Sequence, residues 1–129
     1  MPEKLEKWYE GTVEEGEKLG RTIGFPTLNL DPSLLPLTTP TGVYAALVKY
    51  RNREYKGALY YGPRLVLGEK KNVLEIYLLD FNQDIYGEKL RFVLKKFLRL
   101  PQPFADLNSL KKQLLQDKEL VDKSVILVR

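Results

Sequence analysis

The segment Gly11–Leu30, which reads GTVEEGEKLGRTIGFPTLNL, joins a glycine-rich loop to an extended run. Its first fourteen residues include Gly11, Gly16, Gly20 and Gly24. Glycine accepts positive φ and lets main-chain N–H groups approach a ligand closely, as a loop that wraps around phosphates requires. The loop is therefore a candidate anion cradle, and the alternative interpretation is a surface hairpin with turn glycines.

General phosphate-loop motifs do not support the cradle. Gly11 and Gly16 have the spacing of a Walker A motif, but Glu17 stands where that motif has lysine, and the chain contains no G-x-G-x-x-G run. Because short motifs give frequent false positives, spacing alone favours the hairpin interpretation.

The loop runs into a predicted strand that ends at Leu30. Pro26 fixes its own φ and biases the preceding residue toward an extended conformation, which favours a strand over a helix start. In a strand, Thr27 and Asn29 point the same way, about 6–7 Å apart, while Leu28 and Leu30 face the core. Hydroxyl and amide oxygens suit Mg²⁺, which takes much of its remaining shell from water and substrate phosphates. We therefore expect a phosphate site and a metal site side by side.

Length and composition indicate one soluble globular domain over residues 1–129. The chain of 15.0 kDa has 43% hydrophobic and 29% charged residues, and it is long enough to bury a core without disulfide or metal staples. It contains no cysteine and no histidine. Thiol nucleophiles, Cys-based zinc sites and histidine bases are thereby excluded.

The charge pattern indicates a solvated surface rather than a polyanion-binding block. The net charge is +4 with a pI near 9.2, but 21 basic residues are interleaved with 17 acidic ones. No apolar run approaches the ~18 residues of a membrane helix, and the start of the chain lacks a signal-peptide core. We expect a cytoplasmic monomer without a membrane or nucleic-acid partner.

Apolar alternation and turn residues predict an all-β fold with one helix. A polarity shift near Lys95 and Lys96 indicates a β-bulge, and Asp106 or Asn108 is expected to cap the helix. Closing the sheet would remove its exposed edges, so we expect a six-stranded antiparallel barrel with the C-terminal helix packed outside. The predicted strands cover 8–14, 26–30, 42–50, 55–61, 73–81 and 89–100.

One run of residues closely resembles the signature of riboflavin kinases. It reads Gly16-x-x-Leu-Gly20-Arg21-x-x-Gly24-Phe25-Pro26-Thr27-x-Asn29, and further matching blocks follow in the order of that family and cover nearly the whole chain. The resemblance implies a six-stranded Greek-key barrel that transfers phosphate from ATP to riboflavin. The further blocks are Gly42–Ala45, Leu74–Phe81, Asp84–Gly87 and Leu98-Arg99.

Glu75 is the candidate catalytic base. It lies between Leu74 and Ile76 in the most apolar predicted strand, where partial desolvation would raise its pKa toward the working pH. The alternative is a carboxylate on the solvent face of an alternating strand. The resemblance favours the first interpretation, because it places Glu75 on the acid that faces the ribityl 5′-hydroxyl of riboflavin.

The resemblance also implies the binding residues. Thr27 and Asn29 match the Pro-Thr-x-Asn pair that holds the Mg²⁺–nucleotide, and the glycine-rich loop matches a flap over ADP. Lys18 and Arg21 are candidates to steer phosphate, and an exposed surface charge is an equally good interpretation of Lys18. Arg99 matches a family arginine near the loop that closes over the flavin, and its alternative is a surface charge at a strand end. Asp80 and Phe81 lie where family members have flavin contacts, although their simplest interpretation is a strand end and a core ring. The implied nucleotide-binding set is Gly16, Lys18, Gly20, Arg21, Gly24, Pro26, Thr27 and Asn29.

The chain departs from the bacterial members of this family in two respects. The segment Leu59–Gly68 keeps a glycine but lacks the usual Pro-Thr-Phe portion, and the 129 residues do not include the FMN adenylyltransferase domain to which bacterial members are commonly fused. We therefore expect either a free-standing kinase or one domain of a longer protein, fused to or working with an FMN adenylyltransferase. The first departure leaves open a flavin- or nucleotide-binding barrel without catalysis. The basic pI and eight tyrosines leave a nucleic-acid-binding barrel as a third hypothesis.

Overall fold

The computed structural model describes residues 6–16, 24–65, 68 and 70–127, and these form six strands and a C-terminal helix. The prediction of six strands followed by a helix is confirmed. The elements are β1 (Trp8–Thr12), β2 (Leu28–Leu30), a 3-10 turn η1 (Pro32–Leu34), β3 (Gly42–Tyr50), β4 (Arg53–Pro63), β5 (Asn72–Leu78), β6 (Lys89–Arg99) and α2 (Leu107–Ser124).

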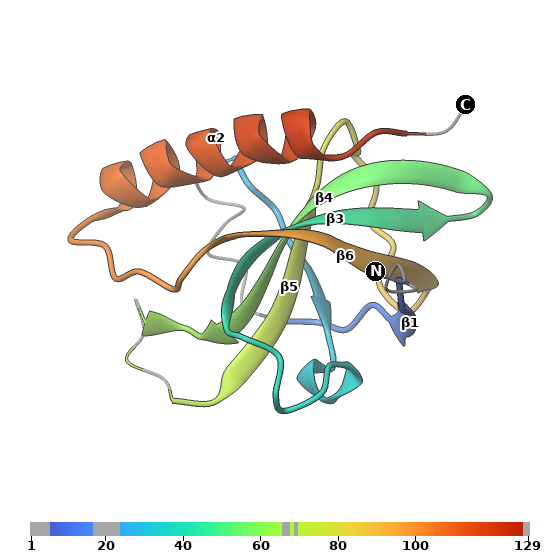
Figure 1. Ribbon diagram of the computed structural model, residues 1–129, viewed down its shortest axis with the longest axis horizontal. Coiled ribbons are helices and arrows are strands. Elements are labelled where there is room, and N and C mark those ends of the chain that lie inside the picture. Colours follow the sequence, from blue (N-terminus) through green and yellow to red (C-terminus); the bar gives the residue numbers. More distant parts are fainter. Residues whose placement is uncertain (1–5, 17–23, 66–67, 69, 128–129) are drawn as a thin grey trace, which may run out of the picture.

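The strands form one antiparallel sheet in the order β1-β6-β3-β4-β5-β2. Strands β3, β4 and β5 follow one another as a meander, and β6 returns to lie beside β3, which is the Greek-key order. Figure 1 shows the sheet curling around its inner face, with α2 lying across the outer face.

The predicted closed barrel is not confirmed, because the described sheet is open and curled. Its edge strands β1 and β2 are not neighbours in the strand order; an isolated bridge between Glu14 and Asn29 lies beyond the end of β1. There the N–H of Glu14 donates to the carbonyl of Asn29 at 2.7 Å. The β2 ladder is only three residues long, and Pro26 has no N–H to extend it on its N-terminal side.

Strand side chains alternate between an inner core and an outer face. On β5, Leu74, Ile76 and Leu78 are buried inside the curl, whereas Tyr77 packs with the outer cluster under α2. This is the two-residue repeat of a strand. Since Glu75 has the same parity as Tyr77, it also lies on the outer face, on the side of the sheet that the helix covers.

Strand β6 contains the predicted bulge. Its register with β3 shifts between the pairs Ala45–Lys96 and Ala46–Leu94, which leaves Lys95 without a direct partner. A second shift after Phe97 sets Arg99 opposite Val43. Bulges bend a strand and increase its twist, and here they lie in the half of β6 that leads to Arg99.

A buried ion pair joins α2 to the outer face of the sheet. Asp117, on α2, is 1% exposed, and its two carboxylate oxygens accept from Nε and Nη2 of Arg99 at 2.9 and 2.8 Å. Gln113, one helical turn away, donates to the same carboxylate at 3.1 Å. The pair fixes the helix at the place where the loop after β6 begins.

The cap of α2 gives a first testable prediction. The carboxylate of Asp106 accepts from the N–H of Ser109 at 2.8 Å, and this backbone hydrogen bond is the main reason that the pKa of Asp106 is lowered from its ordinary value of 3.8. We expect Asp106→Ala to lower the midpoint of thermal unfolding by about 2–6 °C at pH 7. The matched variant Asp106→Asn keeps a cap oxygen and should stay closer to wild type.

The pH dependence of this effect has a definite sign. Because the pKa of Asp106 is lower in the folded state, its charge contributes stability above pH 3.8, the ordinary value. This contribution is lost as the pH falls through the lowered folded value. The midpoint difference between wild type and Asp106→Asn should therefore shrink in acid, as differential scanning calorimetry can measure; an unchanged difference would contradict the assignment of the cap.

Candidate active site

One row of cross-strand partners crosses the outer face of the sheet. Asn29 of β2 lies opposite Glu75 of β5, and Glu75 lies opposite Tyr60 of β4. The row continues from Tyr60 to Val43 of β3 and then to Arg99 of β6. Direct partners in antiparallel strands have Cβ atoms about 4.5–5.5 Å apart. The register therefore sets the amide of Asn29 beside the carboxylate of Glu75.

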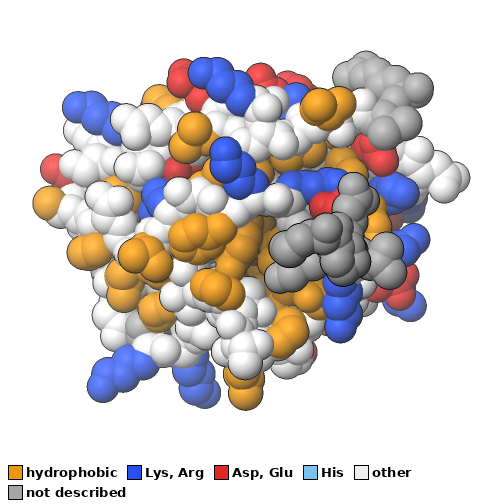
Figure 2. All heavy atoms as spheres, viewed as in Figure 1, with side chains coloured by type: hydrophobic (Ala, Val, Ile, Leu, Met, Phe, Trp, Pro, Cys, Tyr) orange, Lys and Arg blue, Asp and Glu red, His pale blue; other side chains and the backbone are white. Residues whose placement is uncertain are grey.

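A cavity of about 170 Å³ lies between this row and α2. It is mainly apolar, with a few polar groups, as small-molecule sites usually are. Figure 2 shows hydrophobic side chains gathered on the face below α2. The lining residues include Phe25, Thr27, Val43, Ala58, Tyr60, Arg64, Glu75, Tyr77, Arg99, Phe104, Leu110, Leu114 and Asp117.

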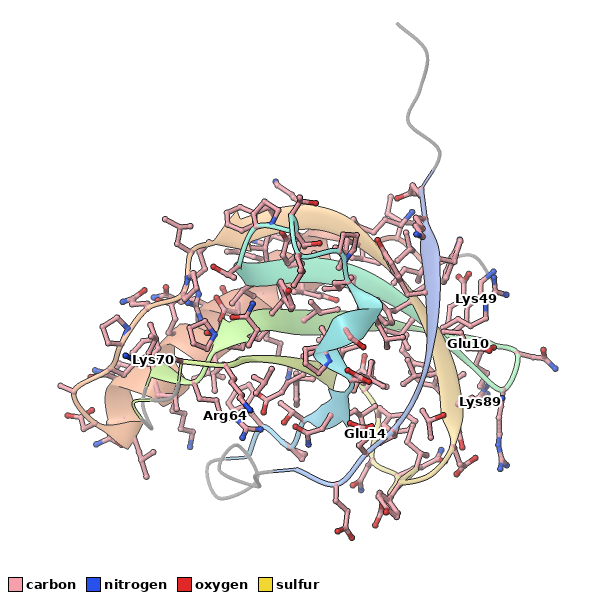
Figure 3. All side chains as sticks on the ribbon, turned by 90° about the horizontal axis from the view of Figure 1, so that it is seen from below. Glu10, Glu14, Lys49, Arg64, Lys70 and Lys89 are labelled. Atoms are coloured by element: carbon pink, nitrogen blue, oxygen red, sulfur yellow. The ribbon has the colours of Figure 1, made fainter. Side chains whose placement is uncertain are left out.

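Glu75 lines this cavity in an ion pair with Arg64. The side chains of both residues are 18% exposed, and Nη2 of Arg64 lies 2.8 Å from Oε1 of Glu75. The same nitrogen lies 3.4 Å from Oδ1 of Asn29. Figure 3 shows Arg64 on the same side of the molecule as Glu14, whose backbone bridges to Asn29.

Tyr60 holds the turn that carries Arg64. Its hydroxyl donates to the carbonyl of Pro63, and so ties together the backbone at the end of β4. Burial raises the pKa of Tyr60 to about 12, the negative charge of Glu75 adds to the rise, and Arg99 opposes it. The phenol therefore stays protonated and remains a donor near neutral pH.

The sequence reasoning missed Arg64 and Tyr60 as site residues. In the sequence, both residues stand out only as part of Leu59–Gly68, which departs from the family pattern. A usable signal was available, since a hairpin between β4 and β5 brings the residues after Gly62 back toward the strand that contains Glu75.

Neutral oxygen donors gather at the edge of β2. Thr27 lines the cavity, and Asn29 is in contact with the segment that follows β1, where a Cβ added at Gly16 would come within 2.4 Å of the Asn29 side chain. Gly24 has a φ of +86° and Pro26 is exposed. The predicted residues Lys18, Gly20 and Arg21 lie outside the described residues.

The donor set fits a magnesium ion that is held mainly by its nucleotide. Among the described residues, no group of three or more Asp, Glu, His or Cys side chains could hold a metal by itself. Thr27 offers a hydroxyl and Asn29 an amide oxygen, which are hard ligands. Such a pair suits Mg²⁺ that keeps waters and binds substrate phosphates.

Two predicted flavin residues lie away from this cavity. Asp80, with a φ of +56°, lines a separate groove with Lys56 and Asp122. The ring of Phe81 meets that of Tyr55 edge-on at 5.1 Å. The third, Arg99, does line the cavity, and its guanidinium lies 5.9 Å from the centre of the Phe104 ring.

A curled sheet with a mainly apolar pocket between one face and a helix defines a small β domain with the usual form of a small-molecule site. Its family follows from comparison with known proteins. The chain belongs to the riboflavin kinase family, whose model, described as Flavokinase, matches residues 5–125.

Curated relatives agree with this assignment, and a solved structure has a similar fold. The RNA-binding riboflavin kinase RibR of Bacillus subtilis is 37% identical over 92% of this chain and 51% of its own length. The bifunctional riboflavin kinase/FMN adenylyltransferase of Escherichia coli K12 is 38% identical over 84% of this chain and 34% of its own length. A crystal structure of a macrolide-efflux protein from Streptococcus pneumoniae is 32% identical with a TM-score of 0.77, over 89% of this chain and 38% of that one.

The chain thus spans about half of RibR and about a third of the Escherichia coli protein. In the part of the chain that the structure describes, no helix is long and apolar enough to cross a membrane.

Proposed function

We propose that this chain transfers the γ-phosphate of ATP to the ribityl 5′-hydroxyl of riboflavin, giving FMN and ADP. The observation that carries the proposal is the direct pairing of Asn29 with Glu75 at the edge of a mainly apolar cavity. In the proposal, this carboxylate activates the acceptor hydroxyl and the neighbouring amide belongs to the donors of a metal–nucleotide complex. Membership of the riboflavin kinase family supports the substrate pair.

In this proposal, Glu75 takes the proton of the 5′-hydroxyl while the 5′ oxygen attacks the γ-phosphorus. The bond from phosphorus to the β–γ bridging oxygen breaks, and its electron pair leaves with ADP. Thr27 and Asn29 would hold Mg²⁺, which neutralises phosphate charge when it is bound with the nucleotide. Most of the acceleration must come from such positioning and charge, since phosphoryl transfer needs little covalent chemistry from the protein.

We further propose that the flavin ring occupies the cavity under α2. Its walls offer aromatic and aliphatic surface from Tyr60, Tyr77 and Phe104, and Arg99 gives it a cationic side. Glu75 is part of the cavity wall, and we propose that a ring bound there extends its ribityl chain toward the carboxylate. Residues Gly16 to Gly24, with Lys18 and Arg21, are proposed to cover the nucleotide.

The test is product formation. The chain is incubated with riboflavin, ATP and Mg²⁺, and the flavins are separated by chromatography; we expect FMN and an equal amount of ADP. A binder without catalysis would quench riboflavin fluorescence and yield no FMN. Omitting Mg²⁺, with chelator present, should abolish turnover if the metal assignment is right.

We also propose that an FMN adenylyltransferase consumes the FMN that this chain makes, because the name of the Escherichia coli relative joins the two activities. RNA is not among the proposed partners, although the name of RibR mentions RNA binding. Several basic side chains on the strands and hairpins are paired with carboxylates, which leaves less positive surface for a polyanion. The pairs are Arg51–Glu88, Lys56–Asp122 and Lys95–Glu6.

A further inference from the structure

Arg64 contacts both the proposed base, Glu75, and one of the proposed metal ligands, Asn29. Its Nη2 is 2.8 Å from Oε1 of Glu75 and 3.4 Å from Oδ1 of Asn29. The guanidinium therefore spans the boundary between the acceptor side and the nucleotide side of the site. A phosphoryl group that moves from ATP to a hydroxyl at Glu75 must pass close to it.

The backbone before Arg64 is held so that the side chain is aimed at this point. The hydroxyl of Tyr60 donates to the carbonyl of Pro63, the residue before Arg64. Tyr60 is also the cross-strand partner of Glu75. The carboxylate and the arginine that reaches it are therefore set by the same pair of strands.

The Arg64–Glu75 pair also differs from the ion pairs at the surface. Both of its side chains are 18% exposed, whereas those of Arg51 and Glu88 are 75% and 33% exposed. Removing two charges from water costs free energy, so a partly buried pair is weak support for a purely stabilising role. Its position inside the cavity indicates a role in the chemistry of the site.

We propose that Arg64 is a further catalytic residue, whose guanidinium contacts an oxygen of the phosphoryl group during transfer while it orients the Glu75 carboxylate. This inference rests on the proposed kinase function. The transfer step moves the 5′-hydroxyl proton to Glu75, forms the bond between that oxygen and the γ-phosphorus, and breaks the bond to the β–γ bridging oxygen, whose electron pair leaves with ADP. Arg64 gains and loses no proton.

A guanidinium suits this double contact better than an ammonium group. Its five N–H donors form a rigid planar fork that matches both carboxylate and phosphate oxygens. Lysine is a point charge on a flexible stem. Arg64→Lys should therefore be more active than Arg64→Met but less active than wild type.

The experiment compares wild type with Arg64→Met, Arg64→Lys and Arg64→Ala, and uses Arg51→Met as the control. Arg51, in the turn between β3 and β4, pairs with Glu88, and neither residue lines the cavity. We expect Arg64→Met to lower kcat for FMN formation by about 10²–10³-fold. The dissociation constant of riboflavin, from fluorescence titration, should change by less than about threefold, because a contact made mainly during transfer affects kcat more than binding. Arg51→Met should stay within about twofold of wild type, as expected for an exposed pair.

Rescue of kcat by added guanidinium distinguishes a catalytic role of Arg64 from a purely structural one. Millimolar guanidinium chloride should raise kcat of Arg64→Ala by about tenfold or more, an expectation set by the size of the lost charge interaction, and it should not affect Arg51→Met. Thermal unfolding of each variant shows whether the fold is retained.

The outcomes separate the two proposals. If wild type forms FMN and Arg64→Met keeps kcat within about threefold, the role of Arg64 is overturned and the kinase function stands. The same holds if Arg64→Ala is folded but unresponsive to guanidinium, or if riboflavin binding falls in step with kcat. If wild type forms no FMN, both proposals fail.

Discussion

Replacing Glu75 with glutamine is expected to lower kcat for FMN formation by about 10²–10⁴-fold, the usual contribution of a general base. The amide has nearly the same shape as the carboxylate but cannot accept the proton of the 5′-hydroxyl. Glu75 is only one part of the cavity wall, so riboflavin should still bind. Coupled detection of ADP gives kcat, and fluorescence titration gives the dissociation constant of riboflavin.

Glu10→Gln is the matched control for this prediction. Glu10 is also a strand carboxylate, and it lies opposite an arginine, Arg91, in the ladder between β1 and β6, but it is exposed and does not line the cavity. It should therefore retain near wild-type kcat. A Glu75→Gln enzyme that is folded and turns over at the wild-type rate would show that another group accepts the proton.

The fold could be predicted largely because its determinants are local. Alternation, proline breaks and turn residues place all six strands and the helix, and the polarity shift at Lys95 marks the bulge. Closure could not be predicted in the same way. It depends on whether the two edge strands pair, and the short ladder of β2 after Pro26 leaves only the isolated bridge between Glu14 and Asn29.

The candidate site shows the same division between local and long-range information. Parity alone predicts Thr27 and Asn29 on one face of the expected strand 26–30. In the structure β2 begins at Leu28, and the position of Asn29 beside Glu75 depends on a register between strands that are far apart in sequence. Arg64 and Tyr60 were missed because their roles come from a side chain that reaches β5 from just after the end of β4, and from a hydrogen bond at that strand end. Asp80 lies beyond the end of β5, in a different groove.

Removing the carboxylate of Asp117 is the second large perturbation. Asp117→Ala should lower the free energy of unfolding by about 3–5 kcal/mol, because it leaves the guanidinium of Arg99 partly buried without its bidentate partner. Urea titration monitored by circular dichroism measures the loss. Asp122→Ala is the control: that carboxylate is on the same helix but is 64% exposed in its pair with Lys56, and exposed pairs contribute about 0–1 kcal/mol.

The double variant Arg99→Met with Asp117→Leu separates the two roles of Arg99. Replacing both charges with apolar groups removes the penalty of an unpaired ion, so the double variant should be more stable than Asp117→Ala. Stability would then be largely restored while the cationic side of the proposed flavin pocket stays absent. If Arg99 contacts the flavin, this folded variant should bind riboflavin at least tenfold more weakly than wild type, by the ~1.5–3 kcal/mol expected of a hydrogen bond to a charged group. Unchanged affinity would assign Arg99 to the attachment of α2 alone, and would leave the aromatic walls and the Glu75 edge of the cavity to hold the ring.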